Sequence, residues 1–197
     1  ENKLILQVIR TSLAILTPPC ITAAPTEGIV DAKIKKNPDG TRYLAVYFAG
    51  PIRSAGGTEL AAIVLLADHV RKLLKLDRYK PTEEEILRFI EELRTYQRKV
   101  SRFQYSVPEN IIEFILRNLP IEVTGIATDK IVASSFRDLP RVETNYLRGG
   151  ALRVINDGIA GRAKKVLKLV KELGIEGWEW IEKVAESMKQ INNQNEQ

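Results

Sequence analysis

The glycine-rich segment 50–58 carries the sharpest potential for chemistry in this sequence. Backbone amides in such a loop, and at the start of a helix that follows it, point outward and attract phosphate groups. A nucleotide-binding P-loop has the pattern G-x-x-x-x-G-K-[ST], but here the glycines are one residue too far apart and the lysine is missing. This argues against an ATPase and leaves two interpretations: tight packing of the chain, or contact with an anion or a partner. The candidate loop residues are Gly50, Ser54, Gly56, Gly57 and Thr58.

Basic residues concentrate late in the sequence. Residues 141–175 include eight basic and three acidic side chains, and this surplus of five equals the net charge of the whole chain, +5. Such a surface could lie along a phosphate backbone, with an affinity that falls as salt rises. A solvated helix face whose side-chain stems pack on neighbours fits the same residues equally well. The candidate nucleic-acid-binding residues are Arg53, Arg148, Arg153, Arg162, Lys164, Lys165 and Lys168.

Gly158 and Gly161 have the G-x-x-G spacing that KH modules use to clamp a nucleic-acid backbone. Two glycines at this spacing also let helices approach each other closely. We therefore keep a KH-like element as a minor alternative to simple packing.

Residues suited to catalysis are few and scattered. Two-metal nucleotidyl transfer needs aspartates clustered on adjacent elements, and the sequence has no D-x-D run or similar motif. The single histidine, His69, and the single cysteine, Cys20, cannot form a Cys/His zinc cluster or an internal disulfide. We expect His69 to be structural or on the surface, and Cys20 to be a small buried hydrophobe. We assign no catalytic or metal-binding residue.

The pattern of apolar residues predicts the elements that carry these candidates. Alternation over 27–36 and 42–49, with Asn37-Pro38-Asp39-Gly40 between them, predicts a β-hairpin. Capping boxes at Thr82–Glu85 and Ser106–Glu109 predict two helix starts, and Gly174 the end of a third helix. Helices are expected over 4–16, 59–76, 82–100, 106–119, 149–173 and 178–188, and short strands within 121–135.

The chain of 197 residues, 44% hydrophobic and 28% charged, is therefore expected to fold as an α+β protein with a small antiparallel sheet covered by several helices. We divide it into a leading amphipathic helix (1–20), an α+β domain (21–189) and a polar, disordered tail (190–197). Since it begins at Glu1 with a helical pattern already running, we expect a fragment of a larger protein. No apolar run approaches the ~20 residues of a membrane span, so we expect a cytoplasmic location.

Several stretches together resemble one family, the large subunit of archaeal family D DNA polymerase. They occur in order and cover the chain from about residue 10 to about residue 184. The resemblance is specific because all of them occur in sequence. They are AVYFAGPIRSAGGTE (45–59), LDRYKP (76–81), RFQY (102–105), NLPIEVTG (118–125), VETNYLRGGAL (142–152) and GIEGWEW (174–180).

The resemblance implies a module without catalytic residues of its own. The family's large subunit is several times longer than this chain, pairs with a small subunit, and synthesises DNA on a primer–template with Mg²⁺-bound aspartates. Those aspartates and the zinc motifs lie later in the large subunit, and the 3′–5′ exonuclease site lies in the small subunit. The resemblance assigns no cofactor to this fragment, and implies a role in subunit assembly and DNA guidance.

Two alternatives of other classes stay open. One is a nucleic-acid-binding module that uses the basic late helix and the glycine-rich loop. The other is a surface for protein interaction or self-association, built by the helix of residues 4–16 or by the helix that begins at Trp178. The sequence does not decide whether the leading helix docks on the domain or on a partner.

Overall fold

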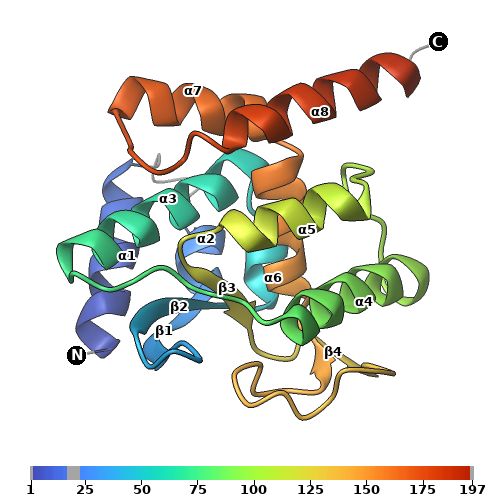
Figure 1. The fold of residues 1–197 in the computed structure, drawn as a ribbon, viewed down its shortest axis with the longest axis horizontal. Helices are drawn as coiled ribbons and strands as arrows, with labels where there is room; N and C mark the ends of the chain where they lie inside the picture. The colour runs from blue at the N-terminus through green and yellow to red at the C-terminus, as the bar shows by residue number, and fades with distance from the viewer. Residues whose placement is uncertain (1, 17–22, 196–197) are drawn as a thin grey trace.

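The computed structural model describes residues 2–16 and 23–195 (Figure 1). The protein combines helices with two small sheets, which confirms the predicted α+β class. Cys20 lies outside the described residues. The helices are α1 (Asn2–Leu16), α2 (Ala23–Gly28), η1 (Gly50–Ser54), α3 (Gly57–Leu73), α4 (Glu83–Lys99), α5 (Glu109–Asn118), α6 (Gly149–Arg153), η2 (Val154–Ala160), α7 (Ala163–Leu173) and α8 (Ile181–Asn195); the strands are β1 (Ile29–Lys36), β2 (Arg42–Phe48), β3 (Glu122–Gly125), β4 (Asp129–Val132) and β5 (Tyr146–Leu147).

The larger sheet contains the predicted hairpin but is not purely antiparallel. Strands β1 and β2 pair antiparallel, and Gly40 takes the positive φ (84°) that the turn between them requires. The third strand, β3, runs parallel to β2, with Val46 opposite Val123. A parallel pair needs a long crossover connection, and here helices α3, α4 and α5 supply it. The expectation of an antiparallel sheet was therefore wrong for β3, because strand direction depends on how the intervening helices return the chain.

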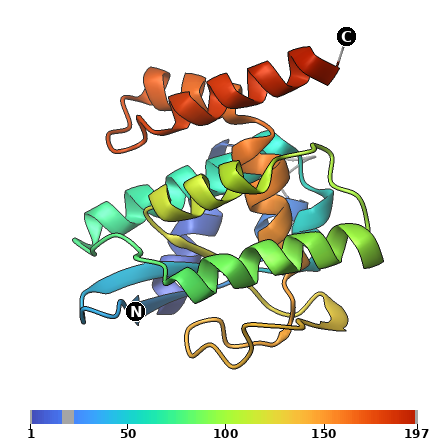
Figure 2. The same ribbon diagram turned by 45° about the vertical axis from the view of Figure 1, so that its right-hand side comes forward.

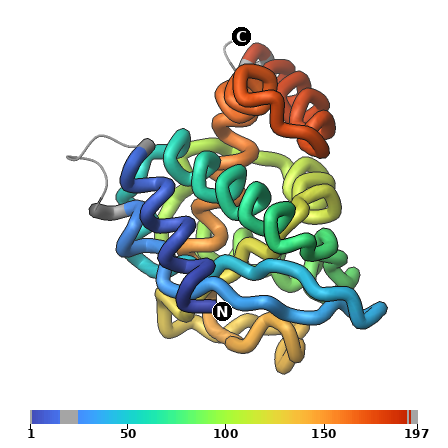
Figure 3. Tube along the Cα trace, turned by 90° about the vertical axis from the view of Figure 1, so that its left-hand side faces the viewer, coloured from blue at the N-terminus to red at the C-terminus, as the bar shows by residue number. Residues whose placement is uncertain are grey.

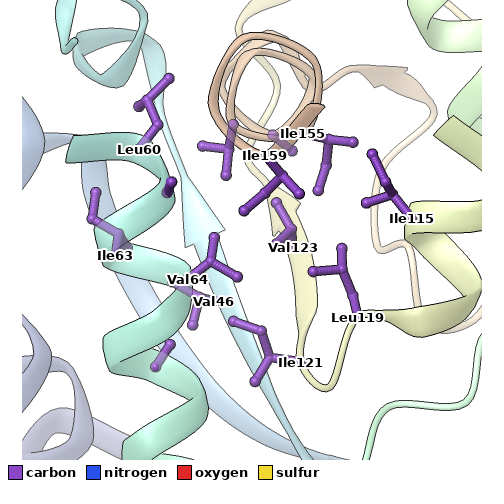
Figure 4. Close-up of a cluster of buried hydrophobic side chains, with 14 of the residues drawn as sticks. Val46, Leu60, Ile63, Val64, Ile115, Leu119, Ile121, Val123, Ile155 and Ile159 are labelled. Carbon is purple, nitrogen blue, oxygen red and sulfur yellow. The ribbon is translucent and has the colours of Figure 1, made fainter. Parts of the chain in front are cut away.

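One hydrophobic core joins the larger sheet to the helices. Figure 4 shows side chains from α3, β2, β3, α5 and η2 converging, all of them buried. Strand β2 packs almost entirely inside, since six of its seven residues are buried. The labelled side chains of this cluster are Val46, Leu60, Ile63, Val64, Ile115, Leu119, Ile121, Val123, Ile155 and Ile159.

Helix α1 docks on the body of the protein, which decides the question that the sequence left open. Ile5, Ile9 and Leu13 share one face and are buried in the common core. The helix lies against β1 and α3 (Figure 3). Its outer face keeps Leu4, Val8 and Ile15 exposed.

The predicted continuous helix 149–173 is broken into α6, the π-helical segment η2, and α7. Every residue of η2 is buried, so this segment runs through the centre of the molecule. A Cβ on Gly158 would lie 2.8 Å from Cβ of Leu60 in α3, and a Cβ on Gly161 would lie 2.1 Å from the ring of Tyr105. Close packing therefore accounts for both glycines of the G-x-x-G pair. The apolar spacing of this region did not distinguish a π-helix from an α-helix.

Helices α7 and α8 form a layer at one end of the molecule, opposite β4 (Figure 2). Gly174 ends α7 in the left-handed conformation, as predicted. The side chain of Trp178 is fully buried, and its Nε1 donates to Asp68 Oδ2 of α3 at 2.9 Å. The polar segment for which we expected disorder is helical as far as Asn195, since α8 continues through it.

The two predicted capping boxes have different outcomes. Thr82 forms its box: the Glu85 amide donates to Thr82 Oγ1 at 3.3 Å, and the Thr82 amide donates to Glu85 Oε2 at 3.0 Å. The prediction at Ser106 was wrong, because Pro108 is the N-cap of α5 and no side chain caps that helix. Helix α2 was not predicted, and α3 ends three residues earlier than the pattern indicated.

Candidate nucleic-acid interface

The glycine-rich loop is a packing element more than an anion cradle. Residues 50–54 form a short 3-10 helix in which Ile52 is buried and the Ser54 hydroxyl donates to the Pro51 carbonyl at 2.8 Å. A Cβ on Gly57 would lie 2.8 Å from both Arg162 Cγ and the Asp157 carbonyl oxygen. Gly57 therefore lets the start of α3 touch the end of η2. This supports the packing interpretation for this glycine.

An acidic side chain also lies at the start of α3. A Cβ on Gly56 would lie 2.2 Å from Oε2 of Glu59, so that carboxylate lies against the loop. A carboxylate at a helix N-terminus interacts favourably with the helix dipole, and it would repel a phosphate at the same place. The remaining loop candidates, Gly50 and Thr58, are half-buried.

Arg53 projects from this loop toward the end of α4. Its Nη1 lies 3.3 Å from the hydroxyl of Tyr96 and 3.5 Å from Asp129 Oδ2, and its side chain is 34% exposed. Arg53 is thus partly neutralised, yet it remains accessible at the edge of the basic region.

Arg148 is not available to a ligand. It is buried, and it forms an ion pair with Glu92 (Nη2 to Oε1, 2.9 Å) while Nη1 donates to Thr124 Oγ1 at 3.0 Å. Burial opposes the charge of Arg148, but Glu92 outweighs it and raises the pKa of the guanidinium. We therefore remove Arg148 from the candidate nucleic-acid contacts.

The partners of Arg148 form a buried ion cluster that the sequence analysis missed. Glu92 is fully buried and also pairs with Arg88, whose Nε lies 2.8 Å from Glu92 Oε1. Burial lowers the pKa of Arg88. Arg88 and Glu92 are four residues apart on α4, a spacing that ordinarily indicates a solvated ion pair, so the sequence carried no sign of burial. Arg88 also donates to the carbonyls of Phe136 and Thr144, which fixes the loop between β4 and β5.

Arg153 also binds other residues of the fold. Its Nη1 pairs with Asp157 Oδ2 at 2.6 Å, and its Nη2 donates to the Ser101 hydroxyl and the Arg102 carbonyl. Burial acts against the charge of Arg153, but the bond to Asp157 prevails and raises the pKa of the guanidinium. Arg153 thus holds the segment that joins α4 to α5, and it is a supporting residue beneath the basic surface.

The remaining candidates lie at the junction of η2 and α7 and along α7. Arg162 is half-buried over the ring of Tyr105, with 5.2 Å between Cζ and the ring centroid. Lys164 and Lys165 are exposed. Lys168 is exposed and lies 3.6 Å from Glu172. Three of these cations are thus close in sequence at one corner, and Lys168 lies one turn further along α7.

Contacts connect Arg53 to this corner. Tyr96 touches both Arg53 and Arg153, Arg153 binds Asp157, and the Asp157 carbonyl oxygen faces Gly57, which in turn faces Arg162. Arg102, which the sequence analysis did not select, is exposed in the same region. Arg102 follows the end of α4, so its position in space depends on the path of the loop, which the sequence does not predict. Figure 1 shows this α4–α5 connection rising on the right-hand side of the view.

Within residues 2–16 and 23–195, no three His, Cys, Asp or Glu side chains lie together as metal ligands would. None of the helices there is both long and apolar enough to cross a bilayer. His69 is exposed on α3, as expected.

Comparison with known proteins identifies the relatives of this chain. Residues 1–187 match the family model of the DNA polymerase II large subunit DP2, N-terminal. DNA polymerase II large subunits of Methanococcus maripaludis and Thermococcus kodakarensis are each 49% identical, over 97% and 96% of this chain. That of Methanothermobacter thermautotrophicus is 52% identical over 96% of it.

The match covers a small part of each relative. The aligned region is 17%, 11% and 17% of these three large subunits, respectively. It extends over almost the whole of the chain and through both the sheet and the basic corner. The chain therefore belongs to the family of N-terminal regions of the DNA polymerase II large subunit, DP2.

Proposed function

We propose that this chain is a non-catalytic N-terminal module of an archaeal family D replicative DNA polymerase. The observation that carries the proposal is the match of residues 1–187 to the N-terminal family model. In the complete enzyme, template-directed synthesis with Mg²⁺ and 3′–5′ exonuclease activity would be provided by parts outside this chain. The module would contribute to subunit assembly and to the guidance of primer–template DNA.

A primer-extension assay tests the non-catalytic part of this proposal. The purified chain is incubated with primer–template DNA, deoxynucleotides and Mg²⁺, with a complete two-subunit polymerase as the positive control. We expect no extended product from the chain alone. A product that depends on this chain would refute the proposal.

DNA guidance would use the basic corner, Arg162, Lys164 and Lys165, together with Arg53. What supports this is that Lys164 and Lys165 are exposed and that neither enters an ion pair within the described residues. Cations without intramolecular partners can neutralise phosphates and release counterions. If these four residues each contact one phosphate, the affinity falls about 150-fold between ~50 and ~200 mM salt.

Anisotropy of labelled primer–template DNA measures this dependence. Lys164→Ala/Lys165→Ala should leave about two contacts, so that the affinity falls only about 12-fold over the same range. The matched control is Lys3→Ala/Lys36→Ala, which removes the same charge from exposed positions of α1 and β1. No binding at ~50 mM salt, or equal salt slopes for both double variants, would eliminate this contact.

Subunit association is a second candidate function, supported by the outer face of α1. Leu4, Val8 and Ile15 are 68%, 41% and 78% exposed there, although the opposite face is buried. We propose that the small subunit covers this face. Sedimentation with the small subunit should show a complex that Leu4→Glu/Ile15→Glu abolishes. A complex unaffected by these changes, or a concentration-dependent homodimer of the chain alone that they abolish, would contradict this assignment.

A further inference from the structure

The segment between α4 and α5 displays two aromatic rings beside a hollow that the proposed phosphate contacts leave unused. Phe103 and Tyr105 are half-buried, and they line a cavity of about 260 Å³ together with Gln97, Arg102 and Ser106. The side chains of these last three residues are exposed, and they make no hydrogen bond or ion pair within the described part of the chain. The hollow thus combines ring surfaces with an amide, a guanidinium and a hydroxyl that are all free.

Side chains of the fold hold this segment through hydrogen bonds, although it has no regular secondary structure. Arg153 donates to the Ser101 hydroxyl and to the Arg102 carbonyl at 2.9 Å. Asp157 Oδ1 accepts the Gln104 amide at 2.9 Å, and Asn156 Nδ2 donates to the Tyr105 carbonyl at 2.9 Å. These three supporting side chains come from the end of α6 and from η2.

The supporting residues are unusual in where they lie. Asn156 and Asp157 are each 3% exposed, so buried polar groups are used to position a surface segment. Both residues occur in the π-helical segment. π-Helical turns are rare in proteins, and those that occur are often found at functional sites. A merely connecting loop has no need of such support, because most loops are held loosely at the surface. The arrangement instead fits a loop whose side chains must be presented in a fixed position.

The aromatic rings are backed by further rings and cations. Phe103 stacks on Tyr96 with 5.2 Å between centroids and 26° between planes. Tyr105 has Arg162 over its ring at 5.2 Å, and its ring lies so close to Gly161 that a Cβ there would be 2.1 Å away. These contacts fix the orientation of each ring before a ligand arrives. Because binding then does not need to order the rings, its entropic cost is lower.

We propose that Phe103 and Tyr105 form a stacking platform for an unpaired base of single-stranded DNA. Gln97, Arg102 and Ser106 would contact the edge of the base, and the adjacent Arg162 and Lys164 would contact its phosphates. Aromatic platforms next to cations are how proteins hold single strands with little sequence preference. The bases of a duplex are stacked on one another, so their faces are not available to the platform. The inference rests on the proposed function and specifies its ligand as the single-stranded part of the DNA.

Anisotropy with two probes tests the platform on this chain. The probes are a labelled oligo-dT and a labelled blunt duplex of the same length. The wild-type chain should bind oligo-dT more tightly at ~50 mM salt. Tyr105→Leu should weaken oligo-dT binding about 5- to 150-fold, the range for loss of one stacked base, while duplex binding changes less than twofold. Tyr105→Phe, which keeps the ring, should bind both probes as the wild type does.

Arg102→Ala keeps the test decisive if Tyr105→Leu does not fold. Arg102 is exposed and its side chain makes no hydrogen bond or ion pair among residues 2–16 and 23–195, so thermal melting of this variant should match that of the wild type. It should weaken oligo-dT binding more than Lys3→Ala, which removes an equal charge from α1. Photocrosslinking of an oligonucleotide carrying 5-iododeoxyuridine should yield a labelled peptide that contains Phe103 and Tyr105.

The outcomes separate this inference from the proposed function. Equal affinity for both probes, or equal loss of both in Tyr105→Leu, would overturn the platform and leave the phosphate contact standing. Tighter binding of oligo-U than of oligo-dT would overturn the assignment to DNA. No binding of either DNA at ~50 mM salt would overturn both the platform and the phosphate contact.

Discussion

Replacing Glu92 by glutamine tests whether the buried ion cluster holds the β4–β5 end of the molecule to α4. The Glu92 carboxylate is fully buried, pairs with Arg88 at 2.8 Å and Arg148 at 2.9 Å, and accepts the Arg148 amide at 2.9 Å. Glutamine keeps the shape and one acceptor oxygen. It removes the only charge that faces both guanidiniums within the described residues, and it turns an NH₂ group toward their donors.

The expected cost is large because two buried cations lose their counter-charge. Removing one partner from a buried ion pair costs about 3–5 kcal/mol. Since a domain of this size loses about 2–4 °C of Tm for each kcal/mol, Glu92→Gln should lower the melting temperature by about 6–20 °C. Total stabilities are about 5–15 kcal/mol, so the variant should still be mostly folded at 25 °C unless the wild type is marginal.

Thermal and urea unfolding followed by circular dichroism measure this cost. The matched control is Glu84→Gln on the same helix, where the carboxylate is exposed and enters no ion pair within the described residues, so its effect should stay within about 0.5 kcal/mol. Hydrogen exchange should speed up between β4 and β5, because Arg88 also binds the carbonyls of Phe136 and Thr144. If Glu92→Gln unfolds at the same urea concentration as Glu84→Gln, the cluster does not stabilise the fold as argued.

Three further predictions concern packing, capping and pH. Gly161→Ala should cost about 1–3 kcal/mol by urea unfolding, because the new Cβ would overlap the Tyr105 ring; an unchanged midpoint would contradict the close contact. Thr82→Ala should cost about 0.5–2 kcal/mol through loss of the capping box, whereas Thr82→Ser should restore most of it. Burial raises the pKa of Glu122 above its usual 4.5. The protonated Glu122 side chain therefore stabilises the fold fully below pH 4.5, and this stabilisation is lost as the pH rises through the pKa of Glu122 in the folded state. The unfolding free energy of the wild type relative to Glu122→Gln should therefore decline across that window, and a difference that rises with pH would show the opposite shift.

Local chemistry was sufficient to predict most elements of the fold. The hairpin turn over residues 37–40, the capping box at Thr82 and the left-handed Gly174 each depend on a few neighbouring residues. A resemblance in ordered motifs was sufficient to indicate the large subunit of a DNA polymerase, and residues 1–187 match the N-terminal family model of the DNA polymerase II large subunit DP2. The basic corner was also visible, since Lys164 and Lys165 are exposed as a charged helix face usually is.

Features that depend on contacts between distant segments could not be predicted from the sequence. Arg148 looked like its basic neighbours, but Glu92, 56 residues away, binds it inside the protein. The direction of β3 depended on three intervening helices, and the π-helical turn depended on burial on every side. The sequence by itself determined the class of fold, the family and the basic character of the late helix, because these follow from spacing and composition. Only the tertiary structure decided which arginines stabilise the fold and that side chains of α6 and η2 hold the segment RFQY (102–105), because both depend on long-range contacts that no local pattern encodes.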